Sequence, residues 1–151
     1  MKHTWWIAPM VFILDLITKV LALRLPPEGR TLIPGLLGLR LTRNTGMAFS
    51  LLSGYPRLLG VLSLLLIAGA FFFLRKKQMS ILARAGGMMM MGGAAGNAAD
   101  RLIRGYVTDM VEPLFVNFAV FNLADVRLVT GCLMIMINLF REQPESSEQN
   151  E

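Results

Sequence analysis

Four long apolar stretches, separated by polar segments, are the feature that most constrains this chain. A helix that crosses the hydrocarbon core of a bilayer needs about 20 mostly apolar residues. Charged residues make up 17% of the sequence, whereas a soluble domain carries about 25%. The sequence therefore predicts a single all-α membrane domain over residues 1–141, a four-helix transmembrane bundle. Its helices are expected over about residues 5–23, 58–74, 82–102 and 121–140.

The third predicted helix is rich in glycine and alanine. Small residues let neighbouring helix backbones approach closely in a membrane. We therefore expect this helix to be central in the bundle, the alternative being a loosely packed or kinked helix. The glycines concerned are Gly86, Gly87, Gly92, Gly93 and Gly96.

The segment between the first two helices, about residues 25–56, is too long for a simple connector. Residues 32–42 contain turn signals followed by alternating apolar and polar residues, as in a short strand. We expect a small extracytoplasmic β-containing loop against the membrane surface. A plain interfacial loop is the alternative.

Basic residues predict the orientation of the bundle. They crowd the short connection between the second and third helices, which marks that connection as cytoplasmic. Both termini then lie in the cytoplasm, and the acidic tail, residues 142–151, is expected to be disordered there. The first helix is expected to stay uncleaved, because two charges interrupt it and a small-residue cleavage site is poorly formed. The basic residues of the connection are Arg75, Lys76, Lys77 and Arg84.

The sequence gives little support for binding to nucleic acid, a metal or a cofactor. The sequence pI is near 10, but basic and aromatic residues do not alternate and no zinc-finger or helix-turn-helix spacing appears, so nucleic-acid binding is not expected. Cys132 is the single cysteine and provides neither a disulfide framework nor a thiolate metal site. We expect no metal and no cofactor.

All four aspartates lie inside or at the ends of apolar stretches, whereas the glutamates lie in loops and the tail. A charged carboxylate at the centre of a membrane helix costs about 2.5–3.5 kcal/mol on insertion scales. This placement favours a polar site within the bundle. The topology brings Asp100, Asp109 and Asp125 to the outer face, the last two at the far ends of the last two helices, with Asn44 at the same level. Asp15 and Lys19 are one helical turn apart and can pair on one face.

Two aspartates that approach closely cannot both ionise, so one keeps a proton while the other acts as a base toward water. Such a pair can hydrolyse a peptide bond without a metal. The alternative for Asp109 and Asp125 is helix capping or pairing with Arg104 and Arg127. For Asp15 with Lys19, a buried structural ion pair is the favoured interpretation.

Five segments resemble, in the same order, motifs of the lipoprotein signal peptidase family, also called type II signal peptidases. They span nearly the whole chain and are Asp15-Leu16-Ile17-Thr18-Lys19, Asn44-Thr45-Gly46-Met47-Ala48-Phe49-Ser50, Gly96-Asn97-Ala98-Ala99-Asp100-Arg101, Gly105-Tyr106-Val107-Thr108-Asp109 and Phe121-Asn122-Leu123-Ala124-Asp125.

The resemblance implies an aspartic endopeptidase of the bacterial inner membrane. Its substrates are prolipoproteins that carry a diacylglyceryl group, and its active site lies at the outer face among membrane lipids. It implies that Asp109 and Asp125 form a catalytic dyad around one water. It also implies supporting or substrate-binding roles for Asn44, Asn97, Asp100, Arg101, Asn122, Asp15 and Lys19.

The chain departs from the family pattern next to both aspartates. Met110 stands where an aromatic residue is usual, and Val126, followed by Arg127, stands where a hydroxyl residue is usual. The stretch between the two aspartates is also a little shorter. These changes concern turnover more than fold, and they keep open a non-catalytic relative that binds lipoprotein precursors. A small proton-coupled transporter is a further alternative, disfavoured because the aspartates gather at one interface.

Overall fold

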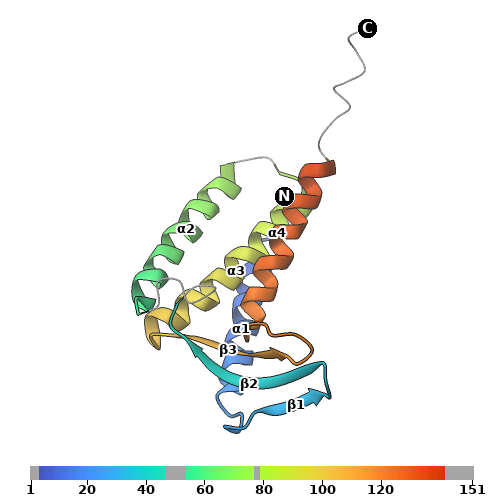
Figure 1. Ribbon diagram of the computed structural model, residues 1–151. Coiled ribbons are helices and arrows are strands. Elements are labelled where there is room, and N and C mark those ends of the chain that lie inside the picture. The colour runs from blue at the N-terminus through green and yellow to red at the C-terminus, as the bar shows by residue number, and fades with distance from the viewer. Residues whose placement is uncertain (1–3, 47–53, 77–78, 142–151) are drawn as a thin grey trace.

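The computed structural model describes residues 4–46, 54–76 and 79–141 and contains four helices and a small sheet (Figure 1). The helices are α1 (Ile7–Ala22), α2 (Pro56–Lys76), α3 (Ile81–Ile103) and α4 (Leu123–Arg141). The strands are β1 (Arg30–Ile33), β2 (Leu37–Asn44) and β3 (Val107–Pro113). The expected disordered tail, residues 142–151, lies outside the described residues.

Helix α3 is central and packs against each of the other three helices. Its glycines make this possible, because a Cβ atom on Gly93 would lie 2.7 Å from the carbonyl oxygen of Ala124 in α4. A Cβ atom on Gly86 would lie 2.6 Å from the carbonyl oxygen of Gly131, also in α4. The prediction of a central third helix is confirmed.

The sheet lies at one end of the bundle (Figure 1). Helices α1 and α3 run toward it, and α2 and α4 run away from it, so α1 begins and α4 ends at the opposite end. Helix α2 also ends, and α3 begins, at that opposite end. Arg75 at the end of α2 and Arg84 near the start of α3 are therefore separated from the site described below by the length of the bundle.

The three strands are antiparallel in the order β1-β2-β3. The β-structure expected between the first two helices is present as β1 and β2. The sequence did not predict β3, and the expectation that Asp109 lies at a helix end was wrong, because Asp109 lies on this strand. Helix α3 ends at Ile103, and the chain turns at Gly105, whose φ of +76° suits glycine. The following residues then pair with the open edge of β2, with Thr42 opposite Asp109 and Asn44 opposite Val107.

A backbone clasp closes the connection from β3 to α4. The N–H of Val111 donates to the carbonyl of Phe121 at 2.8 Å, and the N–H of Phe121 donates to the carbonyl of Val111 at 3.0 Å. Residues 114–119 between them are all exposed. The clasp brings the end of β3 beside the start of α4.

Two helices are long and apolar enough to cross a membrane, at Pro56–Arg75 and Leu123–Arg141. Their mean hydropathy is 2.3 and 1.7, and only 17% of each span is buried inside the protein. Most of their apolar side chains therefore face outward, as lipid-facing helices require. Helix α1, with 16 residues, and the glycine-rich α3 do not reach the same threshold among the described residues, so the four-span bundle stays a prediction.

Candidate active site

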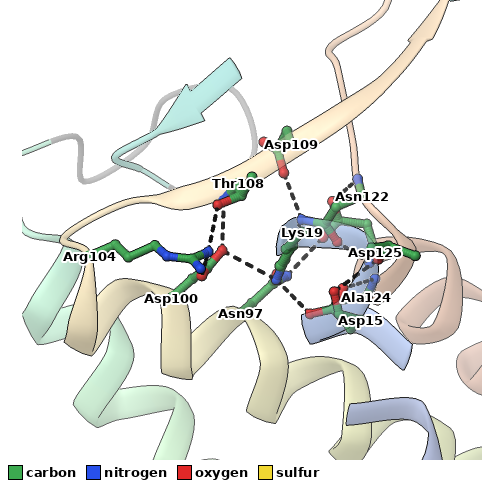
Figure 2. Close-up of polar contacts among 11 residues, drawn as sticks. Asp15, Lys19, Asn97, Asp100, Arg104, Thr108, Asp109, Asn122, Ala124 and Asp125 are labelled. Atoms are coloured by element: carbon green, nitrogen blue, oxygen red, sulfur yellow. Dashed lines mark hydrogen bonds and ion pairs between the residues drawn. The ribbon is translucent and has the colours of Figure 1, made fainter. Parts of the chain in front are cut away.

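Asp109 lies on β3, and its buried carboxylate belongs to a polar cluster (Figure 2). The side-chain amide of Asn122 donates to its Oδ1 at 2.6 Å. Burial raises the pKa of Asp109 to about 6, and the negative charge of Asp125 adds to this effect. Hydrogen bonds from Asn122 and Asn44 act in the opposite direction but do not cancel it. This carboxyl therefore takes up a proton close to neutral pH.

Asp125 is the third residue of α4 and forms a reciprocal cap with Asn122, the residue before the helix. The Asp125 N–H donates to Asn122 Oδ1 at 3.0 Å, and the Asn122 N–H donates to Asp125 Oδ2 at 3.1 Å. This is a capping box, which satisfies otherwise unpaired donors at a helix start. The capping alternative is thus correct for Asp125, and it leaves Oδ1 available to Asn97, whose Nδ2 donates to it at 3.0 Å.

Two asparagine amides connect the two carboxylates. Asn122 Nδ2 donates to Asp109 and, at 3.2 Å, also to Asn97 Oδ1. Asn97 in turn donates to Asp125. Asp109 from β3 and Asp125 from α4 therefore belong to one hydrogen-bonded cluster, together with Asn97 from α3.

Buried charges lie directly beneath this cluster. Lys19 Nζ lies 2.7 Å from Asp15 Oδ2, with both side chains 0% exposed, and 3.6 Å from Asp100 Oδ2. The predicted pairing of Asp15 with Lys19 is confirmed. Arg104 pairs with Asp100 at 2.6 Å, so this arginine neutralises Asp100 in place of the predicted alternative, Asp109.

The buried carboxylates also hold backbone in place. Asp100 Oδ2 accepts from the N–H of Thr108 at 2.8 Å, and this fixes the start of β3 one residue before Asp109. Asp15 Oδ1 accepts from the N–H of Ala124 at 2.9 Å, one residue before Asp125. Sequence reasoning missed both Thr108 and Ala124, because a backbone donor carries no residue-specific signal.

The first loop reaches the cluster through Asn44 and Gly46. Asn44 donates a hydrogen bond to the Asp109 carboxylate, and its Oδ1 accepts from the N–H of Gly46 at 3.0 Å. Arg101 Nη2 donates to the carbonyl of Gly46 at 2.9 Å, and its charge interacts favourably with Asp125 and Asp109. The structure thus brings Asn44 and Arg101 to the predicted site. Residues 47–50 of the same motif lie outside the described residues.

The residues that depart from the family pattern line an apolar cavity beside the cluster. Met110 and Val126 both face this cavity of about 370 Å³, which lies between the end of α1, strands β2 and β3, and the start of α4. Asn122 forms part of its wall. Nε of Arg127 is buried and has no hydrogen-bond partner, and this side chain forms no ion pair with either aspartate among the described residues.

Comparison with known proteins assigns the chain to a family. The sequence model of signal peptidase (SPase) II matches residues 7–141. The chain belongs to the signal peptidase II family. The lipoprotein signal peptidase of Trichormus variabilis is 34% identical and covers 99% of this chain and 97% of its own length. That of Parasynechococcus marenigrum is 33% identical over 93% of this chain and 90% of its own.

Solved structures agree with this assignment. A bacterial membrane enzyme determined by the in meso method at 2.3 Å resolution has a TM-score of 0.88 and 26% identity, and covers 100% of this chain and 95% of its own. A second such structure, at 1.9 Å, has a TM-score of 0.81, 26% identity, and covers 94% and 95%. As a signal peptidase II family member, the chain is a hydrolase of the protease class and an integral membrane protein.

Proposed function

We propose that this chain is an aspartic endopeptidase that removes signal peptides from diacylglyceryl-modified prolipoproteins. The relatives it matches are named lipoprotein signal peptidases. The observation that carries the proposal is the pair of carboxylates, Asp109 and Asp125, joined through the amides of Asn122 and Asn97. The raised pKa of Asp109 supports a proton shared by the pair.

The proposed mechanism uses both protonation states of the pair. The ionised carboxylate accepts a proton from a water molecule as that water attacks the scissile carbonyl carbon. The protonated carboxyl donates a hydrogen bond to the carbonyl oxygen, where negative charge develops. When the tetrahedral intermediate collapses, the proton taken from water passes to the leaving nitrogen. The two groups titrate as a unit, so the cycle needs one proton on the pair.

We further propose that all four helices span the inner membrane, with the sheet and the cluster at the outer face and both termini in the cytoplasm. The end of α2 and the start of α3, which carry Arg75 and Arg84, lie at the end of the bundle opposite the sheet (Figure 1), and basic residues favour the cytoplasmic side. A cluster at the outer interface suits a substrate whose acyl chains stay in the lipid.

The experiment uses the purified protein in detergent micelles with a lipidated prolipoprotein peptide, and cleavage is followed by gel shift. Wild-type protein is expected to cleave, and Asp109→Asn and Asp125→Asn are each expected to abolish cleavage. Glu112→Gln is the matched control, because Glu112 lies on the same strand as Asp109 but pairs with exposed Arg40. Binding of the peptide by wild-type protein without cleavage would instead indicate a non-catalytic relative, and ion flux in liposomes would indicate a transporter.

A further inference from the structure

The amide of Asn97 occupies the junction between the buried charges and the two carboxylates (Figure 2). Its Oδ1 accepts from Lys19 Nζ at 2.8 Å and from Asn122 Nδ2 at 3.2 Å. Its Nδ2 donates to Asp125 Oδ1 at 3.0 Å. All three neighbours come from other elements, α1, the start of α4 and α4 itself.

The chemistry of these neighbours determines which way the Asn97 amide faces. An ammonium group has three donors and no acceptor, so only an oxygen can face Lys19. If the amide were flipped, its NH₂ group would meet the donors of Lys19 and Asn122, and its oxygen would face the carboxylate of Asp125. Each of those contacts is repulsive. The hydrogen bond from Lys19 therefore stabilises the orientation in which the Asn97 amide donates its N–H to Asp125.

We propose that Lys19 is a positioning residue of the dyad, which holds the Asn97 amide so that it donates to Asp125. This inference rests on the proposed function. It gives Lys19 a role beyond the ion pair with Asp15, because the same ammonium group serves Asp15, Asp100 and Asn97 together. A purely structural ion pair would act on the fold and not on the ionisation of the dyad.

The charges around Lys19 guide the choice of variants. Asp15 and Lys19 neutralise each other, and Arg104 neutralises Asp100. Removing Lys19 alone would leave Asp15 buried without a partner, and an unpaired buried charge strongly destabilises a protein. The double substitution Asp15→Asn with Lys19→Met removes both charges. An asparagine at position 15 retains an oxygen that can accept from the N–H of Ala124, as Asp15 Oδ1 does.

The test compares this double variant with Asp15→Asn alone, in which Lys19 keeps Asp100 as a charged neighbour at 3.6 Å and still donates to Asn97. Thermal unfolding in micelles verifies that both variants are folded. The double variant loses the oriented hydrogen bond from Asn97 to the charged Asp125. We therefore expect its kcat to be about 10- to 100-fold below that of the single variant, with KM little changed. The pH profile of kcat is also expected to differ between the two variants, because only Asp15→Asn keeps the Lys19 donor that fixes the Asn97 amide beside the dyad. The other charges near the dyad, Arg101 and the Asp100–Arg104 pair, are the same in both variants.

Equal kcat and equal pH profiles in the two variants would overturn the proposal. Asn97→Asp provides an independent test should the double variant fail to fold. An aspartate at position 97 accepts from Lys19 and Asn122, so the charge of Lys19 supports its folding, but it has no N–H for Asp125. We expect the same loss of kcat, and wild-type activity in Asn97→Asp would also overturn the proposal. An inactive wild-type protein would instead refute the proposed function itself.

Discussion

The replacement Asp109→Asn is expected to stabilise the folded protein at neutral pH while abolishing cleavage. The pKa of Asp109 is raised from 3.8 to about 6, so the folded state binds its proton more tightly than the unfolded state does. Stability therefore falls as the pH rises from 3.8 through about 6. Each pKa unit corresponds to about 1.4 kcal/mol, so a difference of about two units lowers the free energy of unfolding by about 3 kcal/mol. The full loss is reached once the pH is above this range.

Asparagine at position 109 removes this loss, because it is neutral at every pH and its oxygen can still accept from Asn122. For a chain of this size, about 3 kcal/mol corresponds to a rise in Tm of about 6–12 °C. The rise is expected at pH 7.5 and should be nearly absent at pH 4, where Asp109 is protonated in the folded protein.

The assay is thermal unfolding in detergent micelles at both pH values, followed by circular dichroism, alongside the cleavage assay. Glu112→Gln is the control, because Glu112 is 25% exposed and its partner Arg40 is 52% exposed, and surface ion pairs contribute about 0–1 kcal/mol. A change in Tm for Asp109→Asn that is the same at pH 4 and pH 7.5, or a lower Tm at pH 7.5, would refute the reasoning.

Three further predictions follow from the same geometry. The alkaline limb of kcat/KM in the free enzyme is expected to have its midpoint at about 6, where the pair loses the proton that it shares. Activity that is flat from about pH 4 to 9 would contradict a shared proton. Arg127→Ala is expected to keep or raise cleavage activity, since Arg127 forms no ion pair with the dyad among the described residues, and a loss of more than about tenfold would mean that this arginine serves the substrate. Gly93→Val is expected to lower the free energy of unfolding by about 1–3 kcal/mol or more, because the new side chain overpacks against Ala124. The control Gly69→Val should lower it far less, because a Cβ at position 69 meets no atom within 4 Å. Equal losses in thermal unfolding of the two variants would contradict the close approach of α3 to α4.

The sequence predicted the helices of the fold better than its sheet. Apolar length and the glycine stripe of α3 are local signals, so the helices and the central place of α3 followed from them. Strand β3 depends on the open edge of β2, which lies more than sixty residues earlier in the chain. Such long-range pairing leaves little trace in local composition, and Asp109 was therefore assigned to a helix end.

The residues of the site were predicted mainly through the family motifs, and their connections came only from the structure. The spacing of Asp15 and Lys19 indicated one pair, as found. No sequence signal indicated that Lys19 also reaches Asn97, because these two residues lie on different helices. The capping box of Asn122 and Asp125 has a recognisable local spacing, but the same two residues also serve the cluster, and this second role depends on β3 and α3.

The clasp between Val111 and Phe121 separates the dyad from the loop that follows β3. Its two hydrogen bonds fix the ends of the loop, so we expect a change in loop length to be absorbed outside the clasp without moving Asp109 or Asp125. We therefore expect a shorter spacing between the two aspartates to leave their alignment unchanged. Because the loop is held apart from the two aspartates in this way, a fluorescent reporter attached at exposed Asn117 should leave both aspartates in place. Such a reporter would allow the protein to be followed in a membrane.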